Sequence, residues 1–162
     1  MRNRSAVFPG SFDPFTNGHL DIALRAAEIF DLVYVAVLNN AEKSPLLKAE
    51  RRVELIAKVL GGKKGNFKVE CFDGLLVEYL RKVKVPCVVR GLRATTDYEY
   101  ETQMALMNRH LDSSVETLFM VAREEHSYIS SSMVKQVVRL GGDISALVPK
   151  AFISPLLKSS SK

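Results

Sequence analysis

Apolar residues follow two patterns that alternate along the chain. Short, continuous apolar runs at 32–38 and 85–89 are typical of strands buried on both faces of a parallel sheet. Longer stretches such as 19–30, with apolar residues three or four positions apart, predict amphipathic helices. The remaining predicted elements are strands at 5–8, 67–72 and 117–121, and helices at 48–60, 75–83, 97–111, 130–140 and 149–157.

This alternation of strands and helices with short links predicts an α/β fold. We expect a single-domain, Rossmann-like, doubly wound sheet of about five parallel strands with helices on both faces. One domain would span residues 1–162, with a frayed tail at 158–162. Ligands of such sheets bind at the carboxyl ends of the strands. The loops to search for chemistry are therefore 9–19, 39–47, 90–101 and 122–132.

Composition and charge narrow the class of protein. The chain has 162 residues, 47% hydrophobic and 25% charged, which is typical of a globular domain. Its net charge of +5 favours anionic partners. The lysines and arginines are dispersed, so a nucleic-acid-binding module is a remote alternative.

Cellular location is also predicted by the sequence. The apolar run after the N-terminus is broken at once by Pro9-Gly10, which predicts no signal peptide, and no apolar run is long enough to span a membrane. Cys71 and Cys87 lie in strand-like runs, so we expect buried free thiols. These features predict a cytoplasmic protein with no membrane partner.

The first loop, after the opening strand, has the character of a phosphate site. It joins a strand to a helix start, where backbone N–H groups and the helix dipole favour an anion. Ser11 offers a hydroxyl, and His19 can donate a hydrogen bond to a phosphate oxygen. The dinucleotide and P-loop glycine patterns are both absent from the sequence. A plain helix N-cap with an incidental histidine is the alternative.

Cations and hydroxyls follow the other strands. Lys43 lies after the second strand and is by itself typical of a solvated surface lysine. Arg90 and Arg93 follow a buried strand, where guanidinium groups suit a phosphate. For one of these arginines, an ion pair with a carboxylate at 97, 99 or 101 is the alternative. The serines at 130–132 suit both a helix cap and a second phosphate cradle.

With these loops in view, nearly the whole chain, residues 5–157, resembles a known family. Thr16-Asn-Gly-His19 is similar to the T/H-x-G-H signature of the nucleotidyltransferase superfamily, and 128–132 is similar to its second signature. Within that superfamily the chain resembles bacterial phosphopantetheine adenylyltransferases. The segments that carry this closer resemblance are 8–19, 90–94, 97–101 and 107–111.

The resemblance implies transfer of the adenylyl group of ATP to 4′-phosphopantetheine, which gives dephospho-coenzyme A and pyrophosphate in coenzyme A biosynthesis. The substrate phosphate would attack the α-phosphate in line. Because that phosphate is ionised near neutral pH, no general base is needed. The resemblance also implies Mg²⁺ held mainly by the ATP phosphates, a homohexamer, and coenzyme A as a candidate feedback ligand.

The resemblance also assigns roles to individual residues. His19 would stabilise the transition state, and Lys43 and Arg93 would act with it as catalytic residues. Substrate contacts would come from Ser11, Lys43, Leu76 and Arg90. ATP contacts would come from Ser11, Phe12, His19, Gly91, Leu92, Arg93, Glu101, His126, Ser127, Tyr128, Ile129, Ser130, Ser131 and Ser132.

Two positions depart from the family pattern. Ser11 stands where threonine is usual, and the hydroxyl is kept. His126 stands where a larger aromatic residue is common near the adenine. The nearest alternatives are a nicotinamide mononucleotide adenylyltransferase or a glycerol-phosphate cytidylyltransferase of the same superfamily. A degenerate member kept for regulation is a further alternative, and the presence of His19, Lys43, Arg90 and Arg93 argues against it.

Overall fold

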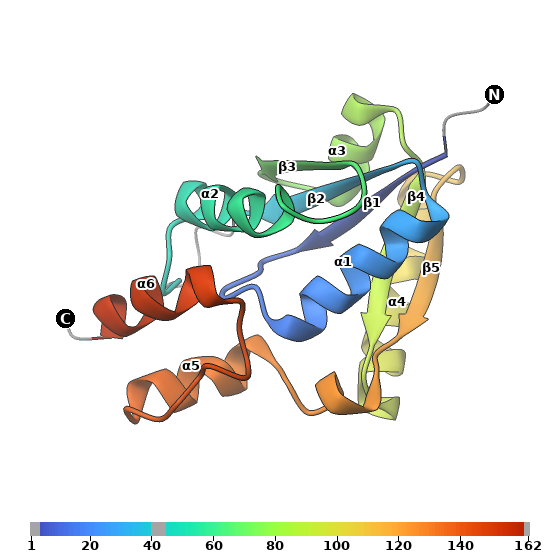
Figure 1. The fold of residues 1–162 in the computed structure, drawn as a ribbon. Helices are drawn as coiled ribbons and strands as arrows, with labels where there is room; N and C mark the ends of the chain where they lie inside the picture. Colours follow the sequence, from blue (N-terminus) through green and yellow to red (C-terminus); the bar gives the residue numbers. More distant parts are fainter. Residues whose placement is uncertain (1–3, 40–44, 161–162) are drawn as a thin grey trace.

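Five parallel strands form one sheet in the order β3-β2-β1-β4-β5 (Figure 1). The computed structural model describes residues 4–39 and 45–160. The strands are β1 (Ser5–Gly10), β2 (Leu32–Leu38), β3 (Phe67–Phe72), β4 (Cys87–Leu92) and β5 (Glu116–Val121). The helices are α1 (Asn17–Ile29), α2 (Ala49–Leu60), α3 (Leu76–Val83), α4 (Thr95–Leu111), α5 (Ser131–Arg139) and α6 (Lys150–Ser160), with a short 3₁₀ helix η1 (Glu124–His126).

The predicted fold is confirmed, and several predicted boundaries are wrong. β4 begins at Cys87 rather than at residue 85, because Pro86 lacks the N–H that a strand ladder requires. The same strand continues to Leu92, so Arg90 is a strand residue and not a loop residue. The frayed tail predicted from residue 158 is also wrong in part, since residues 158–160 belong to α6.

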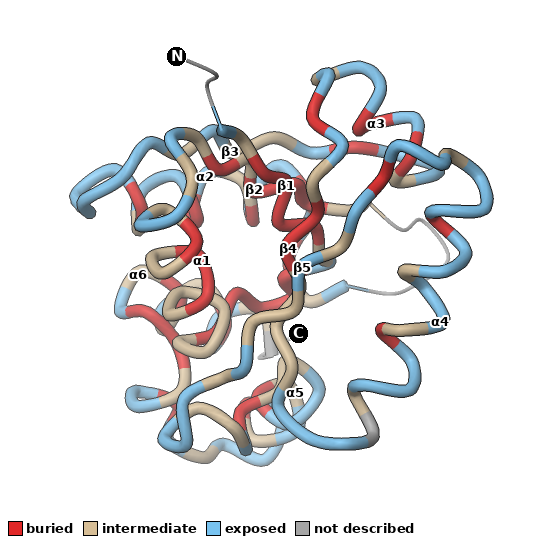
Figure 2. Tube along the Cα trace, turned by 90° about the vertical axis from the view of Figure 1, so that its right-hand side faces the viewer, coloured by how far each residue is buried: buried red, intermediate tan, exposed pale blue. Residues whose placement is uncertain are grey.

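The two faces of the sheet are covered differently. Apolar side chains of α1, α2, α5 and α6 pack with β1 and β2 into one core, and α3 packs into a smaller core on the other face. Although α4 is the longest helix, its only buried side chains among those described are Glu101 and Asn108, and Figure 2 shows most of its length exposed. The sequence therefore leaves α4 without an apolar face directed at the core.

The sheet opens between β1 and β4. β1 pairs with β2 from Ser5 to Gly10, but with β4 it pairs only at Val7 and Val88. The strands that follow β1 in the chain, β2 and β3, lie on one side of this junction, and β5, which follows β4, lies on the other. The junction is therefore the topological switch point of the sheet. Ligands of doubly wound folds bind in the crevice at such a point. The carboxyl ends of β1 and β4 therefore face the expected site.

The expected burial of the two cysteines is wrong for Cys71, which is exposed, while Cys87 is half-buried. Cys71 lies on β3, an edge strand that has a neighbour on one side only. Across the part of the chain that the structure describes, no helix has the length and apolar character needed to cross a membrane.

Candidate active site

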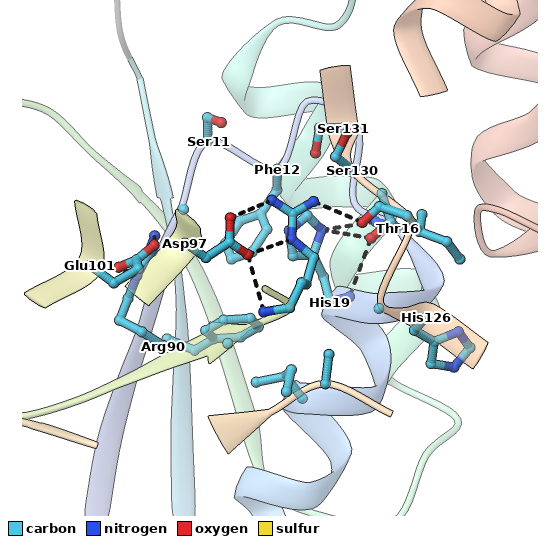
Figure 3. A pocket seen from close by; sticks show the side chains of 18 of the residues that line it. Ser11, Phe12, Thr16, His19, Arg90, Asp97, Glu101, His126, Ser130 and Ser131 are labelled. Atoms are coloured by element: carbon cyan, nitrogen blue, oxygen red, sulfur yellow. Dashed lines mark hydrogen bonds and ion pairs between the residues drawn. The ribbon is translucent and has the colours of Figure 1, made fainter. Parts of the chain in front are cut away.

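The first turn of α1 contains a reciprocal pair of hydrogen bonds between Thr16 and His19. The Thr16 side chain caps the helix by accepting from the His19 backbone N–H at 3.3 Å. In return, the Thr16 backbone N–H donates to His19 Nδ1 at 3.0 Å, and Figure 3 shows the two residues in contact at the helix start. Because Nδ1 accepts, a neutral His19 ring carries its proton on Nε2. The helix-cap and phosphate-donor interpretations of this motif are therefore compatible.

The His19 imidazole lies among three phenylalanine rings. Its ring centroid is 6.4 Å from that of Phe8, 5.1 Å from Phe12 and 5.6 Å from Phe15. This burial, and secondarily the positive charges of Arg90 and Arg93, lower the pKa of His19 to about 3. At neutral pH the ring is therefore uncharged and offers one N–H donor rather than a cation.

Arg90 near the end of β4 and Arg93 directly after it both form ion pairs. Arg90 binds Glu101 on α4 through two hydrogen bonds, Nε to Oε2 at 2.7 Å and Nη2 to Oε1 at 2.5 Å. A further Arg90 N–H donates to the carbonyl of Pro9. The guanidinium thus holds the end of β1 at the place where the β1–β4 ladder has stopped.

Arg93 is paired in the same way, with Asp97 one helical turn further along. Its Nε and Nη2 donate to the Asp97 carboxylate at 2.9 and 3.1 Å, and Nη1 donates to the Ile129 carbonyl at 3.0 Å. Burial alone would raise the pKa of Asp97, but the hydrogen bonds from Arg93 outweigh it and lower that pKa. The ion-pair alternative, expected for one arginine, therefore holds for both.

A first pocket of about 270 Å³ opens at the carboxyl ends of β1 and β4 (Figure 3). Its walls come from the β1–α1 loop, the first turn of α1, the end of β4, the start of α4, and the segment from Ala122 to the start of α5. Sequence-predicted residues in these walls are Ser11, Phe12, His19, Arg90, Gly91, Arg93, Glu101, His126, Ile129, Ser130, Ser131 and Ser132.

A second pocket of about 260 Å³ adjoins the first and is more apolar. It shares Pro9, Gly10, Ser11, Arg90 and Glu101 with the first pocket, so the Arg90–Glu101 ion pair lies between the two. The remaining residues of its wall are Leu38, Phe72, Leu76, Val88, Tyr100, Met104, Ala105, Asn108 and Thr117.

Some of the predicted site residues lie elsewhere. Among the described residues, Leu92, Ser127 and Tyr128 line neither pocket. The Ser127 hydroxyl instead donates to the Glu124 carbonyl at 2.8 Å. Lys43 falls outside the described residues.

Several residues of the pockets were missed by sequence reasoning. Thr16 was named only as part of the signature, and Asp97 only as a possible ion-pair partner of an arginine, so neither was predicted to line the site. No local pattern marks Tyr100, Met104 and Asn108, whose contribution to the second pocket depends on how α4 packs.

The glycine at position 10 is explained by the packing of a neighbouring aromatic ring. A Cβ atom built there would lie 2.9 Å from the Phe12 ring, so the packing of that ring already requires glycine. The Phe12 backbone itself is left-handed, with φ of 48°.

A parallel sheet with paired arginines, a neutral histidine donor and a serine-capped helix around one pocket defines a nucleotide-binding α/β protein of the nucleotidyltransferase class. A family model described as cytidylyltransferase-like matches residues 7–137. Phosphopantetheine adenylyltransferase from Stenotrophomonas maltophilia (strain K279a) is 51% identical over 155 residues, which cover 96% of this chain and 91% of the relative. The enzyme of that name from Clostridium novyi (strain NT) is 49% identical, with 98% of both chains covered.

The chain therefore belongs to the phosphopantetheine adenylyltransferase family, within the cytidylyltransferase-like nucleotidyltransferases. Fold comparison agrees at the level of architecture. Plasmodium falciparum nicotinic acid mononucleotide adenylyltransferase, complexed with NaAD, superimposes with a TM-score of 0.70 at 13% identity. That match covers 95% of this chain and 94% of the other.

Proposed function

We propose that this enzyme transfers the adenylyl group of ATP to 4′-phosphopantetheine, producing dephospho-coenzyme A and pyrophosphate. The observation that carries the proposal is the pair of adjoining pockets that meet at Ser11 and Arg90. The polar pocket suits the nucleotide, and the more apolar one suits a pantetheine arm. The two reacting phosphates would then meet at the boundary that both pockets share.

The chemical step follows from the charges of the reactants. An ionised oxygen of the phosphopantetheine phosphate attacks the α-phosphorus of ATP and forms the new P–O bond. The bond to the β-phosphate bridging oxygen breaks, and pyrophosphate leaves with that electron pair. No proton has to be removed from the nucleophile near neutral pH, so catalysis depends on position and on charge stabilisation.

His19 is the residue best suited to stabilise the transferred group. Its Nδ1 is occupied by the Thr16 backbone N–H, so Nε2–H is the donor available to a non-bridging oxygen of the α-phosphate. Because burial keeps the ring neutral, this donor is present throughout the physiological pH range. Its hydrogen bond would strengthen as negative charge develops in the transition state.

The remaining roles divide between the two substrates. We assign Ser11, Lys43 and Arg90 to the substrate phosphate and Leu76 to the pantetheine arm. Gly91, Arg93, His126 and the start of α5 are assigned to ATP. Ser130 supports this assignment, since its hydroxyl accepts from Met133 N–H at 3.1 Å and fixes the N-terminus of α5 at the pocket wall.

Mg²⁺ is proposed to enter with ATP. The two carboxylates in the wall of the first pocket, Asp97 and Glu101, are each ion-paired with an arginine. No group of three or more His, Cys, Asp or Glu side chains that could hold a metal is found within residues 4–39 and 45–160. This donor set suits an ion whose ligands come mainly from the triphosphate, where it would neutralise the leaving pyrophosphate.

Pyrophosphate release tests the proposed activity. The purified enzyme would be supplied with ATP or CTP and, in turn, with phosphopantetheine, nicotinamide mononucleotide or glycerol 3-phosphate. We expect turnover with ATP and phosphopantetheine and at least a hundredfold lower kcat/KM with the other combinations. Turnover with nicotinamide mononucleotide and none with phosphopantetheine would contradict the proposal.

We also propose that the enzyme works as a cytoplasmic homo-oligomer, hexameric by resemblance. Support comes from α4, where Leu106 and Met107 are 62% and 53% exposed. Apolar patches of this kind commonly mark interfaces. Leu106→Ser should lower the molar mass in sedimentation, with little change in secondary structure. An unchanged molar mass would remove this face of α4 from the interface.

A further inference from the structure

A cluster of three charged side chains lies behind the first pocket, and nothing above assigns it a role. Asp13 is 5% exposed and Arg52 is 2% exposed, and Lys135 on α5 completes the cluster. As formed by the described residues, neither pocket includes any of these three side chains. Burying charged groups is costly unless they are paired and hydrogen-bonded, so their partners indicate what they hold together.

Asp13 joins three segments of the chain. It belongs to the β1–α1 loop, two residues after Ser11. Its Oδ2 and Oδ1 accept from the backbone N–H groups of Leu46 and Leu47 at 3.1 and 3.2 Å. The same carboxylate accepts from Lys135 Nζ at 3.2 Å. One carboxylate therefore fixes the β1–α1 loop to the chain that enters α2 and to α5.

Arg52 closes the same arrangement from the side of α2. Its Nε donates to the Leu47 carbonyl at 2.9 Å, so both backbone polar groups of Leu47 are held, one by Asp13 and the other by Arg52. Its Nη1 donates to the carbonyls of Ser11 and, at 3.3 Å, Leu38. The carboxyl ends of β1 and β2 are thus connected through one guanidinium.

The contact between Asp13 and Lys135 has the most direct consequence for the pocket. Ser11 lies in one wall of the first pocket, and the start of α5 lies in another. Lys135 is one turn along α5 from that wall, and Ser131 makes a second tie by donating to the Pro14 carbonyl at 2.9 Å. None of the described residues of α5 lines the second pocket. The contacts to α5 therefore bear on the width of the first pocket, whereas the second pocket has no wall from this helix.

We propose that Asp13, Arg52 and Lys135 are positioning residues that hold the β1–α1 loop and α5 at the separation required to bind ATP. The inference rests on the proposed function, in that the first pocket is taken as the ATP site. It goes beyond that function because the three residues contact neither substrate. Displacements near 1 Å from such a change are enough to weaken catalysis strongly.

The test is the effect of Lys135→Met on the two substrates separately. We expect KM for ATP to rise about tenfold, because the ammonium that holds α5 to the loop is lost. KM for phosphopantetheine should change less than twofold. Lys135→Arg, which keeps a cation on the helix, should return KM for ATP to within about threefold of wild type. Lys58→Met, at an exposed lysine of α2, is the matched control and should behave as wild type.

Asp13→Asn is a second variant that tests the same positioning role. The effects of Asp13→Asn and Lys135→Met on KM for ATP should not multiply in the double variant, because both remove one contact. Amide hydrogen exchange at Leu46 and Leu47 should become faster in Asp13→Asn and stay unchanged in Lys135→Met. Should Asp13→Asn fail to fold, Lys135→Met and its arginine counterpart still decide the question.

Three results would overturn the positioning role: equal rises in KM for both substrates, a wild-type KM for ATP in Lys135→Met, or multiplying effects in the double variant. Calorimetric titration with ATP separates this inference from the proposed activity. If the wild-type protein bound ATP but turned over no phosphopantetheine, the proposed activity would be wrong. The ratio of the ATP dissociation constants of Lys135→Met and wild type would then still test the positioning role. A wild-type protein that bound no ATP would overturn both.

Discussion

Helices α1 and α4 both contribute to the first pocket, but they are built in opposite ways. α1 buries apolar side chains, Ile22, Ala23 and Ala26, and begins with a side-chain cap. α4 has no side-chain cap hydrogen bond, and the side chains it buries, among those described, are the polar Glu101 and Asn108. The position of α1 is therefore fixed by its own N-cap and by apolar packing against the core. The position of α4 depends instead on the polar partners of its buried side chains.

This difference predicts how substitutions in the two helices will differ. In α1 the functional group is His19, which is held by the helix's own first turn, so its removal should affect catalysis rather than folding. In α4 the functional group is Glu101, which also ties the helix to Arg90 of β4, so its removal should affect both catalysis and folding. The following predictions test this contrast, beginning with the largest expected effect.

His19→Ala should lower kcat by about 10²–10³-fold, the usual consequence of losing a donor to a developing oxyanion. KM for ATP should change only a few-fold, because the contact strengthens in the transition state. Steady-state pyrophosphate release measures both values. His110→Ala, at an exposed histidine of α4, is the matched control. A large rise in KM at unchanged kcat would contradict the role given to His19.

Glu101→Gln should lower kcat/KM for phosphopantetheine about tenfold and the free energy of unfolding by about 1–3 kcal/mol, as hydrogen bonds to a charged group are lost. Enzyme assays and urea denaturation measure the two effects. Glu99→Gln, at an exposed position on the same helix, should change the unfolding free energy by less than about 0.5 kcal/mol. If both variants behaved alike, α4 would not be held to β4 through Arg90.

Stability should fall on acidification because of His19. Its pKa is about 3 in the folded protein against 6.5 for an unperturbed histidine, so between these pH values the unfolded chain binds the additional proton. From pH 6.5 to 5 this costs about 1.5 kcal/mol of unfolding free energy. Urea denaturation across this range should show a flatter dependence for His19→Asn. Equal slopes in the two proteins would mean that the ring is not buried as a neutral donor.

Thr16→Ala should lower the unfolding free energy by about 1 kcal/mol through loss of the N-cap. The fall in kcat should stay within about threefold, because the Thr16 backbone N–H still donates to His19 Nδ1 and keeps the tautomer. Thr16→Ser should restore stability. Thermal denaturation and kinetics on the same samples check this, and a loss of activity as large as that of His19→Ala would show that the side chain sets the imidazole.

The parts of the site that could be predicted from the sequence are those with short spacing. Thr16 and His19 are three positions apart, and Arg93 and Asp97 are four apart, so each pair meets across the start of a helix. The alternation of apolar runs and amphipathic stretches likewise determined the α/β class, because a buried parallel strand and a surface helix require different patterns of apolar residues.

The parts of the site that could not be predicted from the sequence depend on the order of the strands and on the packing of α4. Arg90 reaches the Pro9 carbonyl across 81 positions of sequence, and Lys135 reaches Asp13 across 122. Cys71 is exposed because β3 lies at an edge, and Glu101 is buried because α4 directs it toward Arg90. Local spacing fixes which groups share a helical turn, but contacts between distant segments depend on which strands are neighbours, and only the folded sheet determines that.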